Sequence, residues 1–260
     1  MSAPPLRCAL VQTDVRWEDW EENHARAARH VARAAQGGAR LVVLPEMFAT
    51  GFSMDASRIA QPEGGPTERW LAATAHAHGV HLLAGVAVAR EPLPTNEALL
   101  VSPEGEVRRF AKLHPFSFAK EDRVFGSGQA VVTWDVEGVR VTPLVCYDLR
   151  FPEPFRLAAR ETDLFVVIAN WPDRRRTHWS TLLKARAVEN LCYVLGVNRV
   201  GEGNGLRYAG DSAIHDPWGE TLASAAGQEA ILFADVDPAA VAKTREAFPA
   251  LADVRTRYTR

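Results

Sequence analysis

The chain has 260 residues, a net charge of −2 at pH 7 and a hydrophobic content of 47%. This length and composition fit one large α/β domain, residues 1–260, with a sizeable core. The near-neutral charge argues against a polyanion or a membrane surface as partner, and no apolar run approaches the ~20 residues of a transmembrane helix. We therefore expect no nucleic acid partner and no membrane association.

The cysteines indicate a reducing compartment. Cys8, Cys146 and Cys192 are an odd number in a chain of this length and do not make a disulfide framework. Residues 1–5 lack a basic region followed by an apolar stretch, so they do not resemble a signal peptide. We expect a cytoplasmic protein, because a reactive thiol survives in the reducing cytosol.

The first half of the chain predicts strands, two helices and two hairpins. Strands are expected over residues 6–12, 41–44, 80–89, 98–101, 107–112, 131–136 and 139–146. Helices are expected over 19–36 and 67–78, since each ends at a glycine. The turns at 103–106 and 137–138 predict hairpins. Between the hairpins, residues 114–129 form a long loop of a kind that is usually functional.

The second half continues the alternation of helices and strands. Helices are expected over 154–160, over 177–190 with Thr177 as the N-cap, and over 238–248. Strands are expected over 164–169, 193–198, 213–215, 221–223 and 231–236, and a basic, polar tail over 254–260. Residues 164–169 are apolar throughout, as in a sheet covered on both faces. Because helices alternate with strands while hairpins recur, the sheets should be mixed.

Three chemically capable side chains stand where predicted strands stop: Glu46, Lys112 and Cys146. Ligands of open α/β sheets bind beyond the carboxyl ends of the strands. A carboxylate can take the proton of a thiol, and an ammonium can stabilise the oxyanion formed by thiolate attack. Each residue alone is weak evidence, since free cysteines are often simply buried. Together they predict nucleophilic catalysis by Cys146.

The segments around these residues resemble a known family. L-P-E-M-F (44–48), K-L-H (112–114) and C-Y-D-L-R-F-P (146–152) are similar to the Glu-Lys-Cys signature of the nitrilase superfamily of carbon-nitrogen hydrolases. Residues 44–54, 170–172, 178–190, 198–205 and 208–212 resemble its ω-amidase branch more narrowly. The similarity runs from Leu6 to about Phe248. One departure is Pro115, where relatives usually carry leucine, so the shape of the following loop should differ.

The resemblance implies a fold and a reaction. The fold is a four-layer α-β-β-α sandwich of two mixed sheets, paired through its helical faces into a homodimer or a larger homo-oligomer. The reaction is hydrolysis of the terminal carboxamide of a small ω-amide, such as 2-oxoglutaramate, with ammonia released through a thioester on Cys146. Glu46 is then the base, Lys112 the oxyanion donor and Glu121 a second active-site glutamate. The substrates are a small amide and water, and neither a metal nor an organic cofactor is required.

An ω-amide of a dicarboxylic acid carries a carboxylate at its other end, which arginine binds best. Arg174, Arg175 and Arg176 follow a buried strand and precede a helix N-terminus, which itself favours an anion. One of the three is expected to bind the carboxylate, although a solvated charge run would look the same. Arg150 is the next candidate, but its widely shared motif suggests a structural ion pair. Further candidates for substrate contact are Tyr147, Trp171 and Phe48.

Other interpretations remain open at this point. Cys146 could pair with His114 or His178, as in papain-like enzymes, although the bulky Val145 and Tyr147 disfavour a glutaminase-type elbow. An N-carbamoyl amino acid hydrolase, another aliphatic amidase or a nitrilase would share the same catalytic residues. From a different class, a thiol-based sensor or a binding module could use Cys146 without catalysis. A metal site at His76, His78 and His81 would lack a completing carboxylate or cysteine.

Overall fold

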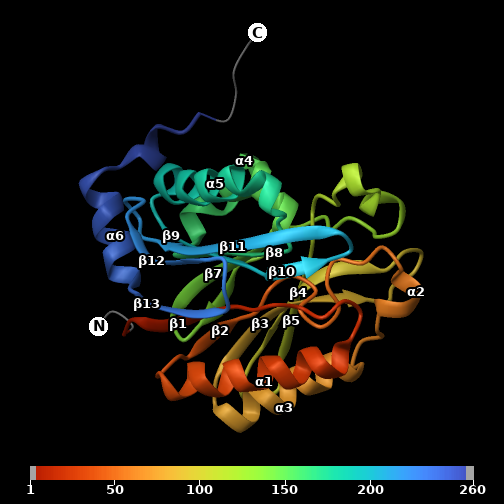
Figure 1. The fold of residues 1–260 in the computed structure, drawn as a ribbon. Coiled ribbons are helices and arrows are strands. Elements are labelled where there is room, and N and C mark those ends of the chain that lie inside the picture. Colours follow the sequence, from red (N-terminus) through yellow and green to blue (C-terminus); the bar gives the residue numbers. More distant parts are fainter. Residues whose placement is uncertain (1–3, 256–260) are drawn as a thin grey trace.

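Two mixed β-sheets lie face to face in the middle of the molecule, and helices cover the outer face of each (Figure 1). This computed structural model describes residues 4–255. Helices α1 (Trp20–Gln36) and α3 (Pro66–His78) cover one sheet. Helices α4 (Pro152–Ala158) and α5 (Arg176–Asn190) cover the other. The expected four-layer α-β-β-α sandwich is therefore confirmed.

The first sheet has the strand order β13-β1-β2-β3-β4-β5. Its strands are β1 (Leu6–Gln12), β2 (Leu41–Val43), β3 (His81–Val88), β4 (Thr95–Val101), β5 (Val107–Ala111) and β13 (Ala230–Val236). β1, β2 and β3 run parallel, whereas β4, β5 and β13 join antiparallel. The parallel centre places the loop after β2, which carries Glu46, beside the end of β3.

The second sheet has the order β10-β11-β9-β8-β7-β6, with β12 also paired to β11. Its strands are β6 (Trp134–Val136), β7 (Val139–Val145), β8 (Leu164–Ala169), β9 (Tyr193–Asn198), β10 (Val200–Gly203), β11 (Leu206–His215) and β12 (Thr221–Ala226). β7, β8 and β9 are parallel, so Cys146 and Asn170 leave adjacent strands at the same edge. The sequence prediction missed β10, whose glycines hide the pattern of a strand.

The alternation of side chains along β1 explains how the layers are held together. Leu6, Cys8 and Leu10 point into the core cluster that includes residues of both sheets. Ala9 and Val11 point the other way, into a second cluster shared with α1 and α3. A strand with period-two alternation thus buries both of its faces. Cys8 is fully buried in this arrangement, as expected of a structural cysteine.

The helices follow local signals with one exception. The Asp19 side chain accepts a hydrogen bond from the Glu22 N–H of α1, and α3 ends at Gly79 with φ of 60°. The remaining α-helices are α2 (Ala56–Ile59) and α6 (Pro238–Ala247). The prediction that Thr177 caps α5 is wrong, because a 3-10 turn over Asp173–Arg175 leads directly into a helix that begins at Arg176.

Two sequence-based expectations concern the chain as a whole. Residues 256–260 of the expected basic tail lie outside the described residues. Among the helices within residues 4–255, none has both the length and the apolar character required to cross a membrane.

A buried histidine joins the outer helices to the Glu46 loop. His24 of α1 stacks on Trp70 of α3 at 4.8 Å between ring centroids and lies 5.8 Å from Phe48, and its Nε2 is 3.2 Å from Thr67 Oγ1. Burial lowers the pKa of His24 to about 4. The imidazole is therefore neutral in the folded protein at neutral pH, whereas in an unfolded chain it protonates near its ordinary pKa of ~6.5.

We expect His24 to make the fold acid-sensitive. Its pKa is depressed on folding, so its contribution to the free energy of unfolding is complete above ~6.5 and is lost as pH falls toward 4. Urea unfolding of His24→Phe between pH 7 and 4 should show a smaller loss of stability than wild type. The exposed His78 provides the control, since His78→Phe should follow the wild-type curve. Equal pH dependence of wild type and His24→Phe would contradict this assignment.

Candidate active site

Cys146 sits on a sharp turn at the end of β7. Its backbone has φ of 47°, a conformation that non-glycine residues rarely adopt, and a 3-10 turn over Cys146–Arg150 follows at once. Val145, just before it, is fully buried, while Cys146 lines a cavity. The turn therefore presents the thiol at the carboxyl edge of the sheet.

Glu46 lies fully buried in the loop after β2. One carboxylate oxygen accepts hydrogen bonds from Lys112 Nζ at 3.0 Å and Asn96 Nδ2 at 2.7 Å, and the other accepts one from the Asn170 backbone N–H at 2.8 Å. Gly85 of β3 makes room for this loop, since a Cβ there would lie 2.4 Å from the Glu46 Cα. The carboxylate is thus fixed by donors from three different segments.

Lys112 lies between two buried carboxylates. Its ammonium donates to Glu46 at 3.0 Å and to both oxygens of Glu121, at 3.1 and 2.9 Å. All three side chains are fully buried. Glu121 also accepts hydrogen bonds from the Phe116 N–H at 2.5 Å and from Asn96 Nδ2 at 3.0 Å. The loop over 114–129 is therefore anchored to the sheet through Glu121.

The charges of the two carboxylates shift the pKa values of Lys112 and Cys146. Burial alone would lower the pKa of Lys112, but the carboxylates of Glu121 and Glu46 outweigh it and raise that pKa, so the side chain is an ammonium. Burial and then the Glu46 charge raise the pKa of Cys146 well above its usual value, and Lys112 opposes this only in part. The resting site therefore holds a neutral thiol beside a carboxylate that can take its proton.

Asp148 ties the Lys112 segment to the Cys146 turn. This fully buried carboxylate accepts hydrogen bonds from the backbone N–H groups of His114 at 2.8 Å and Val145 at 3.1 Å. It also contacts His114 Nδ1 at 2.8 Å, and that ring stacks on Phe151 at 3.9 Å. These bonds fix the relative positions of the two strand ends, and the chain around Pro115 is held by the same contacts.

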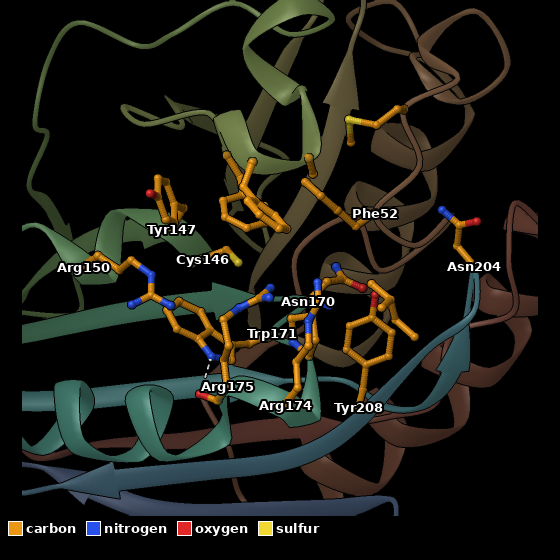
Figure 2. A pocket seen from close by; sticks show the side chains of 16 residues that line it. Phe52, Cys146, Tyr147, Arg150, Asn170, Trp171, Arg174, Arg175, Asn204 and Tyr208 are labelled. Carbon is orange, nitrogen blue, oxygen red and sulfur yellow. Dashed lines mark hydrogen bonds between the residues drawn. The ribbon is translucent and has the colours of Figure 1, made fainter.

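A cavity of about 280 Å³ opens above the thiol (Figure 2). Its walls are mainly aromatic or apolar, and its polar lining comes from arginine, asparagine and tyrosine side chains. The lining residues are Phe52, Met54, Phe116, Phe118, Ala119, Cys146, Tyr147, Arg150, Asn170, Trp171, Pro172, Arg174, Arg175, Asn204, Leu206 and Tyr208. No acidic side chain is among them, although Glu46 and Glu121 lie beneath the floor.

Three arginines give the cavity a positive wall. Arg150 lies 4.7 Å over the ring of Trp171, Arg175 lies 5.2 Å from the ring of Phe116, and Arg174 lies 6.0 Å from that of Phe118. None of the three forms an ion pair with any residue in the described range 4–255. Burial, followed by the neighbouring Arg174, lowers the pKa of Arg175. An anion in the cavity would relieve this mutual repulsion.

The structure corrects three expectations about substrate contact. Arg176 points out of the cavity and forms an ion pair with Asp211 at 2.7 Å. Phe48 is buried in the core against His24 and Trp70, and Phe52 of the same loop lines the cavity instead. Arg150 is not in a structural ion pair within residues 4–255, because its guanidinium stacks on Trp171 and faces the cavity. Tyr147, Trp171, Arg174 and Arg175 do line it.

The sequence did not predict a role for several residues of the site. Asn96 bridges Glu46 and Glu121, and it lies between Thr95 and Glu97 at the polar start of β4, where no local pattern sets it apart. Asn170 binds Glu46 through both its backbone N–H and its side chain. Tyr208 reaches the cavity from β11. Asn170 and Tyr208 both lie within the segments that carry the family resemblance, although no role had been assigned to them.

The histidine and metal alternatives find no support in the geometry. His114 Nδ1 is hydrogen-bonded to Asp148 and His178 Nδ1 to Arg150, at 2.8 and 3.2 Å, and neither histidine is among the residues that line the cavity with Cys146. In the part of the chain that the structure describes, no group of three or more His, Cys, Asp or Glu side chains is placed to hold a metal ion. His76 instead contacts the carbonyl oxygen of Pro103.

Comparison with known proteins agrees with this geometry. Over 256 residues the chain is 41% identical to the omega-amidase YafV of Escherichia coli K12, covering 96% of this chain and 97% of that one. It is 33% identical to the 2-oxoglutaramate amidase of Bacillus subtilis, covering 95% and 96%. The crystal structure of XC1258 from Xanthomonas campestris, a CN-hydrolase superfamily protein with an arsenic adduct in its active site, superposes with a TM-score of 0.93. Its sequence is 36% identical, and the match covers 98% of this chain and 99% of that one.

A broader likeness extends to Nit3 of Saccharomyces cerevisiae, a member of branch 10 of the nitrilase superfamily, with a TM-score of 0.86 at 26% identity over 98% of this chain and 97% of Nit3. The model of the carbon-nitrogen hydrolase family matches residues 7–246. That span contains both sheets, the buried Glu46–Lys112–Glu121 cluster and the Cys146 turn. The chain belongs to the carbon-nitrogen hydrolase family, within the nitrilase superfamily.

Proposed function

We propose that this hydrolase cleaves the terminal carboxamide of a small ω-amide of a dicarboxylic acid, with 2-oxoglutaramate as the model substrate. The observation that carries the proposal is the pairing of a thiol–carboxylate–ammonium cluster with three unpaired guanidinium groups in one cavity. The cluster suits attack on an amide, and the guanidinium groups suit the distal carboxylate. The omega-amidase and 2-oxoglutaramate amidase relatives support the same substrate class.

In the proposed reaction, Glu46 takes the proton of the Cys146 thiol as the sulfur attacks the carboxamide carbon. The Lys112 ammonium and a backbone N–H near Tyr147 stabilise the oxyanion. Glu46 then gives its proton to the departing nitrogen, so ammonia leaves and a thioester remains. Water, deprotonated by Glu46, attacks the thioester carbonyl, and the proton returns to the sulfur as the acid departs. Glu121 holds Lys112 and helps to position substrate and water.

The charge of the cavity also predicts discrimination at the second carbon of the substrate. A 2-oxo acid brings a carboxylate and a neutral oxygen to the arginine wall. The corresponding 2-amino acid would bring an ammonium group close to guanidinium groups, and no acidic side chain lines the cavity to offset the repulsion. We therefore expect 2-oxo ω-amides to be better substrates than glutamine or asparagine.

We propose that residues 1–260 form a single hydrolase domain, that the protein assembles as a homodimer or a larger homo-oligomer, and that it works in the cytoplasm. Size-exclusion chromatography with light scattering tests the homodimer directly. A monomer at micromolar concentration would contradict that part of the proposal without affecting the chemistry.

The decisive test of function is ammonia release from a panel of 2-oxoglutaramate, glutamine, N-carbamoyl amino acids and aliphatic nitriles. We expect turnover of the 2-oxo ω-amide with the highest kcat/KM of the panel. Preference for a carbamoyl amino acid or a nitrile would replace the proposed substrate class while leaving the thiol chemistry intact. No turnover of any member would favour a non-catalytic sensor or binding module.

For the nucleophile, Cys146→Ser should abolish turnover while leaving the fold, because the hydroxyl is much harder to ionise than the thiol. Intact-mass spectrometry of wild type mixed with substrate should show an acyl adduct, and tryptic mapping should place it on Cys146. The buried Cys192 provides a control, since Cys192→Ser should retain both activity and adduct. Wild-type activity in Cys146→Ser would exclude the thioester route.

Replacing Lys112 tests the oxyanion assignment. Lys112→Met removes the ammonium and leaves two carboxylates buried together, so we expect kcat to fall by at least ~10²–10³ with a smaller change in KM. The protein should also unfold at lower urea concentration, because a buried charge loses its partner. Lys184→Met, an exposed change on α5, serves as the control. A variant with normal kcat and raised KM would make Lys112 a substrate anchor instead.

Single Arg→Ala changes at positions 150, 174 and 175 should identify the arginine that binds the substrate carboxylate. Each variant is assayed with a charged ω-amide and with a neutral amide that lacks the carboxylate. Loss of the arginine that binds the carboxylate should cost ~2–5 kcal/mol in transition-state stabilisation with the charged substrate only. Arg176→Ala is the matched control, since Arg176 pairs with Asp211 outside the cavity. If every variant changes kcat/KM equally for the charged and the neutral substrate, these arginines do not bind the carboxylate.

A further inference from the structure

Tyr208 presents a free hydroxyl to the cavity. The side chain extends from β11 beside Asn170 and Arg174 (Figure 2) and is only 4% exposed. No residue in the described range 4–255 accepts a hydrogen bond from its hydroxyl or donates one to it. Burial raises the pKa of Tyr208 to about 12, although Arg199 opposes this, so the phenol keeps its proton. The hydroxyl is therefore a neutral donor available to a bound molecule.

Arg199 fixes the Tyr208 ring from behind. Its guanidinium carbon lies 4.5 Å from the ring centroid, and the side chain is fully buried. Nη2 donates to Asp14 Oδ1 at 3.1 Å and to the carbonyl oxygens of Val15 and Glu202, at 2.8 and 2.9 Å. A guanidinium with this many fixed partners cannot rotate away from the ring. Tyr208 is thus held in one orientation before any substrate binds.

The glycine-rich segment over residues 201–205 leaves room for the guanidinium of Arg199. A Cβ on Gly203 would lie 2.8 Å from Arg199 Nη1, so a larger residue would push the guanidinium out of place. β10, which contains Gly203, pairs with β11, which carries Tyr208. Neither the segment nor Arg199 touches the Glu46–Lys112–Glu121 cluster by any hydrogen bond within the part of the chain described here. Both are connected to Tyr208 instead, because Arg199 packs against its ring and β10 pairs with the strand that carries it.

The cavity therefore offers two kinds of recognition group. The arginine wall suits a charged carboxylate, whereas a neutral phenol suits a neutral acceptor oxygen. In a 2-oxo ω-amide the ketone oxygen lies on the carbon next to the carboxylate. Tyr208, Arg175 and Cys146 line the same cavity, so a substrate bound between the arginine and the thiol also lies within the walls that carry the phenol.

We propose that the Tyr208 hydroxyl, oriented by Arg199, donates a hydrogen bond to the oxygen on the carbon next to the substrate carboxylate and so selects 2-oxo ω-amides over ω-amides with a plain methylene there. This inference rests on the proposed function, because it names the feature of the substrate that the same site recognises. Tyr208 is a specificity-determining residue, and Arg199 is a positioning residue that acts through it.

The test is the ratio of kcat/KM for 2-oxoglutaramate to kcat/KM for glutaramate, which has the same carboxylate and carboxamide but no oxo group. Tyr208→Phe should lower this ratio roughly tenfold, since it deletes one hydrogen bond in a buried setting while keeping the ring over Arg199. Tyr193→Phe, the same change on a strand away from the cavity, should leave the ratio at the wild-type value.

Failure of this inference is distinct from failure of the proposed function. If wild type hydrolyses neither substrate, the proposed function falls. If wild type hydrolyses both and Tyr208→Phe leaves the ratio unchanged, whether activity is kept or lost equally on both, the Tyr208 assignment is overturned while the function stands.

A double-mutant cycle tests the role of Arg199. Arg199→Lys keeps the charge but loses the planar group that stacks on the ring and binds several oxygens at once. It should lower the substrate ratio in the wild-type background and have no further effect on the ratio in Tyr208→Phe. A drop of equal size in both backgrounds would show that Arg199 does not act through the Tyr208 hydroxyl. The ratio is informative even where the variant is less stable, because inactive protein affects both substrates alike.

Discussion

The active site depends on one ammonium buried between two carboxylates. Burial disfavours the charged form of Lys112, and the carboxylates of Glu121 and Glu46 beside it outweigh that effect and raise its pKa. Asn96 donates a hydrogen bond to each carboxylate, and these two bonds hold both side chains in place beside Lys112. Burial and the Glu46 charge raise the pKa of Cys146, so the proposed reaction requires its proton to move to Glu46 as the sulfur attacks.

The segments that carry the buried cluster also contribute to the cavity above it. Glu46, Lys112 and Cys146 follow strands of two different sheets, and Asp148 joins two of those strand ends through backbone hydrogen bonds. The cavity above is lined by the loop after β2, the loop over 114–129, the Cys146–Arg150 turn, the turn after β8 and the segment over 204–208. The turn after β8 contributes Trp171, Arg174 and Arg175 to the cavity, so substitutions there can change substrate choice while the buried cluster stays in place.

Local sequence signals were sufficient for most of the framework. The strand over 164–169 and the strand over 193–198 have the predicted bounds, because continuous β-branched and apolar residues leave few alternatives. Glycines marked the ends of α1 and α3 correctly. The start of α5 was misjudged, since a preceding 3-10 turn supplies its first residues without a side-chain cap. β10 was missed, because its role is to make room for Arg199, and small residues carry no strand pattern.

By itself, the sequence determined the mixed α/β layers, the family resemblance and the three strand ends at Glu46, Lys112 and Cys146, since each depends on residues close together in the chain. The tertiary structure decided which members of Arg174–Arg176 face the cavity, because successive residues at a helix start point in different directions and Arg176 finds Asp211 instead. It also decided the parts played by Asn96 and by Arg199 behind Tyr208. Those contacts join segments far apart in sequence, and no local pattern encodes which distant partner a polar side chain will meet.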